Sequence, residues 1–540
     1  MFRPEVNRDI LSPVSFLRRS ADVYPDKAAV VDGDRRFTYR QFQARVHCLA
    51  SALQGRGIGR GDKVVFICPN TPPLIEAHFA VPMIGAVLVS VNTQLAAREY
   101  LYIIDHSDAK AVFVDNEFAA QVHAVAGEAH KVSLFVNICE YTCGPLLKGP
   151  EYEAFLAEGS DWLSEELDHD ENGLIAINYT SGTTGRPKGV MYSHRATCLQ
   201  TLGQIIQANL RPDSVYLWTL PMFHCNGWGF PWAVTAIGAT HICLRRSLPK
   251  EIFRLIEKES VSHLCASPNV LLTMICFPEA AAVKLRRPLQ VFTAGASPSP
   301  AVIQGMEDIG ADVTHVYGLT ELHGPHAVCE WQARWVDLEP DSVMRMKSRQ
   351  GVPSITSLHM AVIDRETLAP VPHDGKTVGE VVMSGHNVML GYYKDEAATE
   401  AAFRGGWFHT GDLGVVHPDG YLQLTDRASD VIVRGGDMIS SMEIEEIIHQ
   451  HPDVLEVAVV STPDPVWGEA PKAFVVPKRG RTPTAEEIID FCRGRHAEAK
   501  APASVEFGQL PKTATGKTIK SQLRSREWLA FTPKPGLSDM

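Results

Sequence analysis

Residues 174–190 read LIAINYTSGTTGRPKGV, an apolar run that leads into a loop of hydroxyl-bearing residues and glycines with a lysine near its end. Glycines let backbone N–H groups approach phosphate oxygens closely, and the hydroxyls and Lys188 add further donors. The stretch therefore predicts a buried strand followed by an anion-binding loop; a plain surface loop is the alternative. It lacks the Walker pattern GxxxxGK[ST], and Gly516-Lys517-Thr518 matches only the end of that pattern, because Pro511 stands where its first glycine is required. A P-loop NTPase is therefore disfavoured.

Helical and strand patterns alternate along the chain around this stretch. Thr38 and Gln41 form a capping box ahead of an apolar stripe at helical spacing, and a short apolar strand follows at residues 63–68. A helix followed by a buried strand recurs at residues 251–266 and 300–317. Such alternation is typical of parallel sheets covered by helices, so the sequence predicts an α/β fold.

The composition is that of a large globular protein. Of its 540 residues, 45% are apolar and 21% are charged, as in an ordinary soluble globular protein. A chain of this length exceeds what one hydrophobic core accommodates, which predicts two or more domains. A formal net charge of -12 disfavours a general nucleic-acid or acidic-membrane binder, because such proteins need a basic field to hold phosphates. The 11 cysteines are scattered and lack zinc-ligand spacing, which favours a reducing compartment.

Two features argue against export or membrane insertion. The first residues carry acids and prolines where a signal peptide needs a basic start and an apolar run. The longest apolar stretch, residues 79–91, contains Pro82 and Gly85 and is shorter than the roughly 18 residues that a membrane helix requires. We therefore expect a cytoplasmic protein without membrane insertion.

The sequence changes character in its last quarter, near residues 426–430. A charged turn there is followed by an acidic amphipathic helix at residues 442–450 and by strands at residues 455–460 and 472–477. This segment is long enough for a separate α+β domain.

Further motifs follow the glycine-rich loop in a fixed order. They read TAGAS (293–297), HVYGLTE (315–321), WFHTGD (407–412), DR (426–427), GG (435–436) and LPKTATGK (510–517). Together with the loop, they identify the chain as similar to the adenylate-forming superfamily, which includes acyl-CoA synthetases, plant-type ligases, luciferases and the adenylation domains of peptide synthetases. The resemblance implies a large N-terminal domain of helix-covered sheets with a β-barrel-like part, a hinge, and a smaller, mobile α+β C-terminal domain: residues 1–426, 427–430 and 431–540.

The resemblance also implies an ATP site. Tyr317 is expected to stack on adenine, Asp412 to bind both ribose hydroxyls, and Arg427 to clamp the ribose. Thr320 is expected to hydrogen-bond the α-phosphate and Glu321 to hold Mg²⁺, as a hard oxygen ligand should. The residues expected to cradle the phosphates are Thr180, Ser181, Gly182, Thr183, Thr184, Gly185 and Lys188, and those expected around the base are Gly295, Ala296, Ser297 and Gly318.

Lys517 is the residue expected to drive adenylation. A carboxylate that attacks an α-phosphate brings two anions together, so a bridging lysine supplies both positioning and charge neutralisation. In the second half-reaction the resemblance implies that the C-terminal domain rotates. Lys517 then leaves, and the loop with Gly435 and Gly436 forms a tunnel for the pantetheine arm of coenzyme A.

The acyl pocket is indicated by PMFHCNGW (221–228) and by the residues after the HVYGLTE motif. These strings resemble the branch of fatty-acid CoA ligases and plant acyl-activating enzymes. His224 is then expected near the carboxylate and phosphates, and Trp228 at the gate of the acyl chain, although a packed core tryptophan is equally common. His323 stands where threonine, tyrosine or serine is more familiar; it borders an unusual acid or, more commonly for such residues, is a structural histidine.

Two more residues depart from the family pattern. Ser429 occupies a hinge position where relatives commonly carry aspartate or lysine, and Met438 replaces the asparagine or tryptophan usual after the glycine pair. Both departures bear on the domain rotation and on the contacts with nucleotide or CoA.

The expected function is an ATP-dependent acid:CoA ligase of fatty acid metabolism that acts on a hydrophobic medium-chain, long-chain or bulky cyclic acid. Three alternatives stay open: an adenylation enzyme that loads a carrier protein, a ligase that completes one half-reaction, and a non-catalytic binding protein. The sequence identifies neither the acid nor the oligomeric state, and a homodimer is compatible with it.

Overall fold

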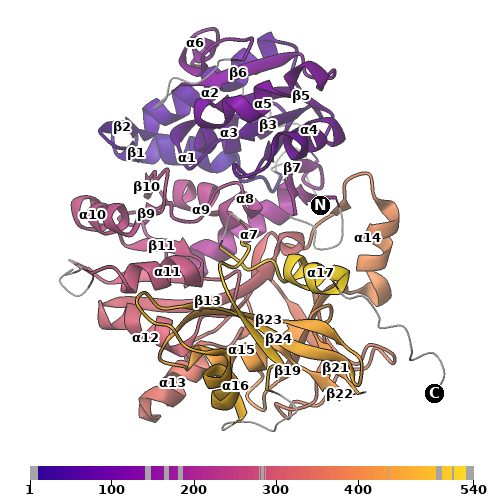
Figure 1. Cartoon of the computed structure of the whole chain (residues 1–540). Coiled ribbons are helices and arrows are strands. Elements are labelled where there is room, and N and C mark those ends of the chain that lie inside the picture. The colour runs from indigo at the N-terminus through magenta and orange to yellow at the C-terminus, as the bar shows by residue number, and fades with distance from the viewer. Residues whose placement is uncertain are drawn as a thin grey trace, which may run out of the picture. The chain divides into compact units, whose positions relative to one another are not determined.

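The structure is a computed structural model of the chain (Figure 1). It describes residues 10–139, 147–162, 170–180, 186–278, 280, 285, 287–435, 437–493, 501–513 and 516–530. The chain divides into two compact units, residues 1–360 with 384–408 and residues 361–383 with 409–540.

The first unit contains a seven-stranded sheet whose central strands are parallel and almost fully buried. Its strand order is β18-β8-β7-β4-β3-β5-β6, with only β7–β8 and β8–β18 antiparallel. The strands are β3 (Lys63–Ile67), β4 (Val87–Ser90), β5 (Ala109–Asp115), β6 (Leu134–Ile138), β7 (Leu174–Tyr179), β8 (Gly189–Ser193) and β18 (Gly391–Tyr392). Burial on both faces is what a parallel sheet covered by helices requires.

Helix α2 (Tyr39–Gly55) illustrates how local sequence determines this unit. The Thr38 side chain accepts a hydrogen bond from the Gln41 backbone, and the Gln41 side chain accepts one from the Thr38 backbone, so the predicted capping box is confirmed. Figure 1 shows α2 beside α3 (Pro72–Met83), and every residue of α3 is buried.

The same unit contains a nine-stranded sheet with the order β15-β14-β13-β12-β11-β9-β10-β1-β2. Its strands are β1 (Ala28–Asp32), β2 (Arg35–Thr38), β9 (Val215–Leu217), β10 (Thr240–Ile242), β11 (His263–Ala266), β12 (Leu289–Thr293), β13 (Ala311–Leu319), β14 (Gly324–Val328) and β15 (Val352–Pro353). Ile252, Leu271 and Ile303 of three helices pack against Leu264 and Val291 of the sheet. Those helices are α10 (Pro249–Glu259), α11 (Pro268–Ile275) and α12 (Pro300–Asp308).

The remaining helices of the first unit connect or cover these sheets. They are α1 (Ser15–Val23), α4 (Ala97–His106), α5 (Ala119–His123), α6 (Tyr152–Leu156), α7 (His194–Gln207), α8 (Cys225–Trp228), α9 (Phe230–Ala236), α13 (Pro340–Lys347), α14 (Glu396–Ala402), and the 3₁₀ turns η1 (Asn116–Phe118), η2 (Ala126–Glu128), η4 (Thr320–Leu322), η5 (Ala333–Asp337) and η6 (Arg404–Gly406).

The second unit contains two sheets. One has the order β16-β17-β19-β20; the other has the order β22-β21-β24-β23, with β25 paired to β24. The strands are β16 (His359–Ile363), β17 (Gly379–Ser384), β19 (Phe408–Val416), β20 (Leu422–Arg427), β21 (Ile432–Arg434), β22 (Asp437–Ile439), β23 (Val454–Asp464), β24 (Gly468–Pro477) and β25 (Ser504–Phe507). The helices are α15 (Ser441–His449), α16 (Ala485–Arg493) and α17 (Lys520–Ala530).

The cores of the second unit lie on both faces of its larger sheet. Ile444 and Ile448 of α15 and Ile488 of α16 pack on one face, and Leu523 of α17 packs with Phe474 on the other. The predicted α/β fold class is confirmed. Within the described residues, no helix combines the length and the apolar character that spanning a membrane demands.

Candidate active site

The predicted phosphate loop joins the two strands of a hairpin. Tyr179 of β7 pairs with Gly189 of β8, and the Thr180 N–H donates to the Lys188 carbonyl at 3.0 Å. Thr180 and Lys188 therefore face each other at the base of the loop. The predicted residues Ser181, Gly182, Thr183, Thr184 and Gly185 lie outside the described residues.

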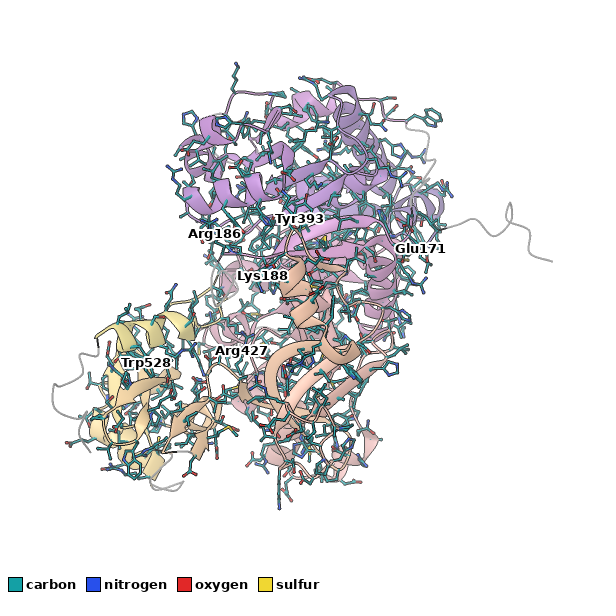
Figure 2. All side chains as sticks on the ribbon, turned by 90° about the vertical axis from the view of Figure 1, so that its right-hand side faces the viewer. Glu171, Arg186, Lys188, Tyr393, Arg427 and Trp528 are labelled. Atoms are coloured by element: carbon teal, nitrogen blue, oxygen red, sulfur yellow. The ribbon has the colours of Figure 1, made fainter. Side chains whose placement is uncertain are left out.

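Lys188 and Glu321 both contact one aromatic side chain, Tyr392, which the sequence did not indicate. The Lys188 ammonium lies 4.6 Å from the centre of the Tyr392 ring, and the Tyr392 hydroxyl donates to Glu321 Oε1 at 2.9 Å. Burial and the Glu321 charge raise the Tyr392 pKa, so its proton is retained. Strand β18 brings Tyr392 there by pairing with β8 beside Lys188, which Figure 2 labels together with the neighbouring Tyr393.

Thr320 and Glu321 are held in η4 by three other segments. The Tyr192 hydroxyl donates to the Thr320 carbonyl at 2.6 Å, and the Met389 N–H donates to the Glu321 carbonyl at 2.8 Å. The Cys225 thiol donates to Thr320 Oγ1 at 3.5 Å. Burial raises the Cys225 pKa to about 12, so this group is a neutral thiol donor. The Thr320 hydroxyl proton is therefore left to point elsewhere.

The segment after His224 has an unusual backbone. The five residues from Cys225 to Gly229 all have positive φ angles, between 47° and 85°. A left-handed conformation costs a non-glycine residue about 1–2 kcal/mol, and such strain persists mainly at functional sites. The turn buries Trp228 against Gly324, where an added Cβ would lie 2.8 Å from the indole ring. His224 directly precedes this turn, which places Cys225 against Thr320 and Trp228 against Gly324.

The predicted adenine-site residues lie at the carboxyl ends of two neighbouring parallel strands. Thr293 of β12 pairs with His315 of β13, so the residues that follow Thr293 and His315 in the chain lie at the same edge of the sheet. The residues gathered there are Gly295, Ala296, Ser297, Tyr317 and Gly318. In open α/β sheets this edge is where ligands bind. The Gln350 side chain, which the sequence did not indicate, donates to Ser297 Oγ at 2.8 Å.

His323 is completely buried and follows η4 directly. Its ring stacks on Tyr192 with 4.0 Å between ring centres, and it meets Trp232 edge-on at 6.4 Å. Burial lowers its pKa to about 3, so the imidazole is neutral. The site of the predicted acyl chain is therefore bordered by aromatic side chains.

In the second unit, Asp412 and Arg427 form an ion pair. They are directly opposite in the β19–β20 register, and Arg427 Nε lies 3.1 Å from Asp412 Oδ1. The aspartate side chain is 5% exposed and that of the arginine (Figure 2) is 31% exposed. A buried carboxylate oriented by a guanidinium suits the hydroxyls of a ribose.

Lys517 lies within the electrostatic range of that pair. Burial, and next the Arg427 charge, lower the Lys517 pKa to about 8, while Asp412 and Asp430 oppose the shift. A turn holds the lysine backbone: the Lys517 N–H donates to Thr513 Oγ1 at 3.1 Å, and the Thr513 N–H donates to the Lys517 carbonyl at 2.8 Å. Asp412, Arg427 and Lys517 therefore lie close together.

The lowered pKa of Lys517 predicts an alkaline limit to adenylation. The ammonium form is the one that neutralises phosphate, so kcat/KM for acid-dependent pyrophosphate exchange should fall as the pH rises through about 8. Arginine keeps its charge at all these pH values, so Lys517→Arg should remove the alkaline fall in kcat/KM even where it lowers the rate itself. The rate of pyrophosphate exchange between about pH 6 and pH 10 checks this prediction. If the arginine variant keeps the alkaline fall in rate, a group other than Lys517 causes it.

The segment predicted as a hinge is bonded to helix α17. Arg524 Nη1 donates to the Ser429 carbonyl at 2.7 Å and to Asp430 Oδ1 at 2.5 Å. One turn earlier on the same helix, Lys520 bonds Glu445 and Ser441 Oγ, each at 2.7 Å. Local sequence patterns do not indicate these contacts, because helix α17 lies about 90 residues after the hinge in the chain.

The predicted pantetheine loop borders an exposed apolar patch. Gly435 has a φ of 61°, its N–H donates to the Trp467 carbonyl at 2.8 Å, and an added Cβ would lie 2.9 Å from the Trp467 ring. The exposed fractions of Met438, Val466 and Trp467 are 74%, 76% and 51%. We call these three side chains the Trp467 patch. Gly436 lies outside the described residues.

Comparison with known proteins agrees with the sequence motifs. The family described as AMP-binding enzyme matches residues 17–393, and the AMP-binding enzyme C-terminal domain matches residues 443–517. An acetate–CoA ligase of Humulus lupulus is 44% identical over 543 residues, which cover 96% of this chain and 95% of the relative. A peroxisomal acetate/butyrate–CoA ligase of Arabidopsis thaliana is 43% identical over 540 residues, which cover 96% and 95%.

A solved structure extends the similarity to the fold. The crystal structure of an anthranilate CoA ligase in complex with anthranoyl-AMP has a TM-score of 0.86 and 25% sequence identity, covering 98% of this chain and 99% of that chain. The resemblance inferred from the motifs is therefore confirmed. With family matches that span most of its length and relatives above 40% identity, the chain belongs to the AMP-binding enzyme family.

Proposed function

We propose that this chain is an ATP-dependent carboxylic acid:CoA ligase, which forms acyl-AMP and pyrophosphate and then acyl-CoA and AMP. The observation that carries the proposal is the position of Lys517 beside Asp412 and Arg427. An ammonium next to a ribose-binding pair lies where the α-phosphate of the same nucleotide would be. The names of the relatives, all acid–CoA ligases, point to the same chemistry.

In the first half-reaction, a carboxylate oxygen of the acid attacks the α-phosphorus of ATP and pyrophosphate leaves. Lys517 bridges the two anions, so that repulsion between them does not oppose their approach. Thr320 donates its hydroxyl proton to the α-phosphate, because the Cys225 thiol already occupies a lone pair of Oγ1. Thr180 and Lys188 hold the departing phosphates, and His224 orients the acid.

Glu321 suits a magnesium ion carried by the nucleotide. Mg²⁺ binds through one or two protein carboxylates and substrate phosphates, and it keeps several waters. The Tyr392 hydroxyl donates to the Glu321 carboxylate and orients it for such a ligand. When bound, the ion supplies charge neutralisation on the phosphates.

In the second half-reaction, the thiol of coenzyme A attacks the acyl carbon and AMP leaves. We propose that residues 431–540 form the mobile C-terminal domain, that residues 427–430 are its hinge, and that residues 1–426 form the N-terminal domain. Rotation about the hinge withdraws Lys517 and brings Gly435 to the acyl-adenylate. The Trp467 patch then offers exposed apolar surface to the pantetheine arm or the adenine of CoA.

The bond between Arg524 and the hinge predicts an effect on one half-reaction only. Arg524→Ala removes hydrogen bonds to Ser429 and Asp430, so Lys517 should occupy its adenylation position less often. We expect acid-dependent pyrophosphate exchange to slow about tenfold while thioester formation from supplied acyl-AMP is preserved.

Arg526→Ala is the matched control, because Arg526 lies on the same helix with a half-exposed side chain bonded to Glu506 and Glu527. It should leave both half-reactions unchanged. Equal slowing of both half-reactions by Arg524→Ala would mean that the arginine only supports the fold.

The acid that we propose is short. Trp228 and Trp232 are both buried, and Trp228 packs against Gly324 close behind Thr320, so little length is available for an acyl chain there. The relatives named above act on acetate and butyrate. The medium-chain or long-chain acid expected from the sequence gains no support from these observations, and neither does a place in fatty acid metabolism. The bulky cyclic acid that was also expected stays an alternative, because the similar solved structure is of an anthranilate CoA ligase.

One experiment separates the proposal from its alternatives. The protein is incubated with ATP, Mg²⁺ and acids of two to twelve carbons, with and without CoA, and pyrophosphate, acyl-AMP and acyl-CoA are measured. A ligase gives acyl-CoA. Acyl-AMP that reacts only with a phosphopantetheinyl carrier protein indicates carrier loading, and acyl-AMP without any thioester indicates a single half-reaction. If no acid leads to the release of pyrophosphate, the remaining alternative is a non-catalytic binding protein.

Location and assembly complete the proposal. We propose a cytoplasmic enzyme, although one relative is named peroxisomal, and a homodimer. Microscopy of a tagged chain and light scattering of the pure protein test these two points.

A further inference from the structure

Four aromatic rings from three segments of the first unit meet beside the phosphate loop. His106, the last residue of α4, stacks on Tyr102 of the same helix with 5.3 Å between ring centres. Its ring meets Tyr179 at the end of β7 and Tyr393, the residue after β18, edge-on at 5.8 Å and 5.9 Å. We call these four side chains the His106 cluster. It joins α4 to two strands of the seven-stranded sheet, one on each side of β8.

Helix α4 carries two of these rings on one face. Tyr102 and His106 are four residues apart, the spacing that places side chains next to each other on a helix. Tyr100, Ile103 and Ile104 of the same helix are buried in the core. The helix therefore packs on the core through other residues, and Tyr102 and His106 contact the strands that carry the phosphate loop.

The His106 cluster holds the first end of the phosphate loop. His106 Nδ1 and the Tyr179 hydroxyl share a hydrogen bond of 2.8 Å. The Tyr179 ring also packs on Gly189, where an added Cβ would lie 3.2 Å from it. Thr180, which is expected to hold phosphate, is the next residue in the chain. The residue that precedes Thr180 is therefore fixed by side-chain contacts.

The second end of the loop is held through backbone carbonyls. The Tyr102 hydroxyl donates to the Pro187 carbonyl at 3.1 Å. The Tyr393 N–H donates to the Gly189 carbonyl at 2.7 Å. Lys188 lies between these two residues, so both of its neighbours are anchored.

Two cations flank Pro187, and each lies over a tyrosine ring. The Arg186 guanidinium is 5.6 Å from the centre of the Tyr102 ring, and the Lys188 ammonium is 4.6 Å from that of the Tyr392 ring (Figure 2). Both distances are within the range of a cation–π contact, about 6 Å. The hydroxyl of Tyr102 thus fixes the carbonyl between two cations whose directions depend on it. Holding a charged group in one direction is how a site is preorganised for phosphate.

We propose that Tyr102 is a positioning residue, which holds the Lys188 end of the phosphate loop in place for the β- and γ-phosphates of ATP, and that His106 does the same for the Thr180 end. The inference rests on the part of the proposed function that places the departing phosphates at Thr180 and Lys188. Tyr102 acts through Pro187 and touches no reacting atom.

The test compares the binding of ATP and of AMP to the full chain by calorimetry, with Mg²⁺ present. Tyr102→Phe keeps the ring against Arg186 and His106 and removes only the hydrogen bond to Pro187. The Kd of ATP should rise about fivefold, the loss expected of one neutral hydrogen bond. The Kd of AMP should not change, because AMP lacks the β- and γ-phosphates. Tyr102→Leu, which also removes the ring, should weaken ATP binding further.

The kinetics should show the same division. In Tyr102→Phe, the KM for pyrophosphate in the exchange reaction should rise about fivefold. Thioester formation from supplied acyl-AMP and CoA should keep its rate, because pyrophosphate takes no part in that step.

Tyr100→Phe is the matched control, because Tyr100 lies on the same helix and its buried hydroxyl faces the Leu95 backbone instead of the phosphate loop. It should leave the Kd of both nucleotides unchanged. The inference is overturned if Tyr102→Phe leaves the Kd of ATP unchanged. It is also overturned if Tyr102→Phe weakens ATP and AMP equally, since the tyrosine would then only support the fold.

Failure of the proposed ligase function gives a different result. If the unaltered protein forms no acyl-AMP with any acid while Tyr102→Phe still weakens ATP alone, the ligase function is wrong and the positioning role of Tyr102 stands. Acyl-CoA formation together with an unchanged Kd of ATP in Tyr102→Phe overturns the positioning role alone.

Discussion

Lys517→Ala is expected to slow acid-dependent pyrophosphate exchange by about 10²–10³-fold, the loss typical of removing one preorganised charge-stabilising group from an active site. The reason is that the alanine variant leaves the acid carboxylate and the α-phosphate without a shared cation. Thioester formation from supplied acyl-AMP and CoA should proceed at the original rate, because the proposed rotation of the C-terminal domain withdraws Lys517 in that step.

Lys512→Ala is the matched control for this experiment. Lys512 belongs to the same motif, but its ammonium bonds Glu456 at 2.6 Å, and its loss should leave both half-reactions close to their original rates. If Lys517→Ala slows both half-reactions equally, the claim that Lys517 acts only in adenylation is wrong.

Glu321→Gln should lower adenylation by about 10²-fold and raise the Mg²⁺ concentration that gives half-maximal exchange. The amide oxygen still accepts the hydrogen bond of Tyr392, so the substitution removes the charge and keeps the local geometry. Titration of pyrophosphate exchange with Mg²⁺ at saturating ATP measures both effects.

Tyr392→Phe separates geometry from charge at this site. It removes the hydrogen bond to Glu321 and keeps the ring beneath Lys188, so we expect a loss of about tenfold, smaller than that of Glu321→Gln. An unchanged Mg²⁺ requirement in Glu321→Gln would remove Glu321 from the metal site.

The local elements were predictable because their signals are local. The capping box at Thr38 defined the start of α2, and the apolar periodicity after residue 440 predicted α15 within one residue at each end. Strands β11 and β13 followed their predicted helices in the same way. Such signals need only a few neighbouring residues, and tertiary packing reinforced them.

The contacts that assemble the site were beyond this kind of reasoning. Tyr392 reaches Glu321 because β18 pairs with β8, two segments about 200 residues apart in the chain. The left-handed turn from Cys225 to Gly229 carries only two glycines, so composition gave little sign of its backbone. Motif resemblance selected the residues with expected roles, whereas the residues that orient them became visible only in the fold.

The central claim is that one nucleotide is joined to an acid through its α-phosphate. The most direct measurement uses ATP labelled at the α-phosphate, with acetate and butanoate as acids, and no CoA. The account predicts that labelled acyl-AMP accumulates and that pyrophosphate is released. When CoA is added, the acyl-AMP should be converted into labelled AMP and acyl-CoA. Label that stays in ATP with every acid, or that appears as ADP, would contradict it.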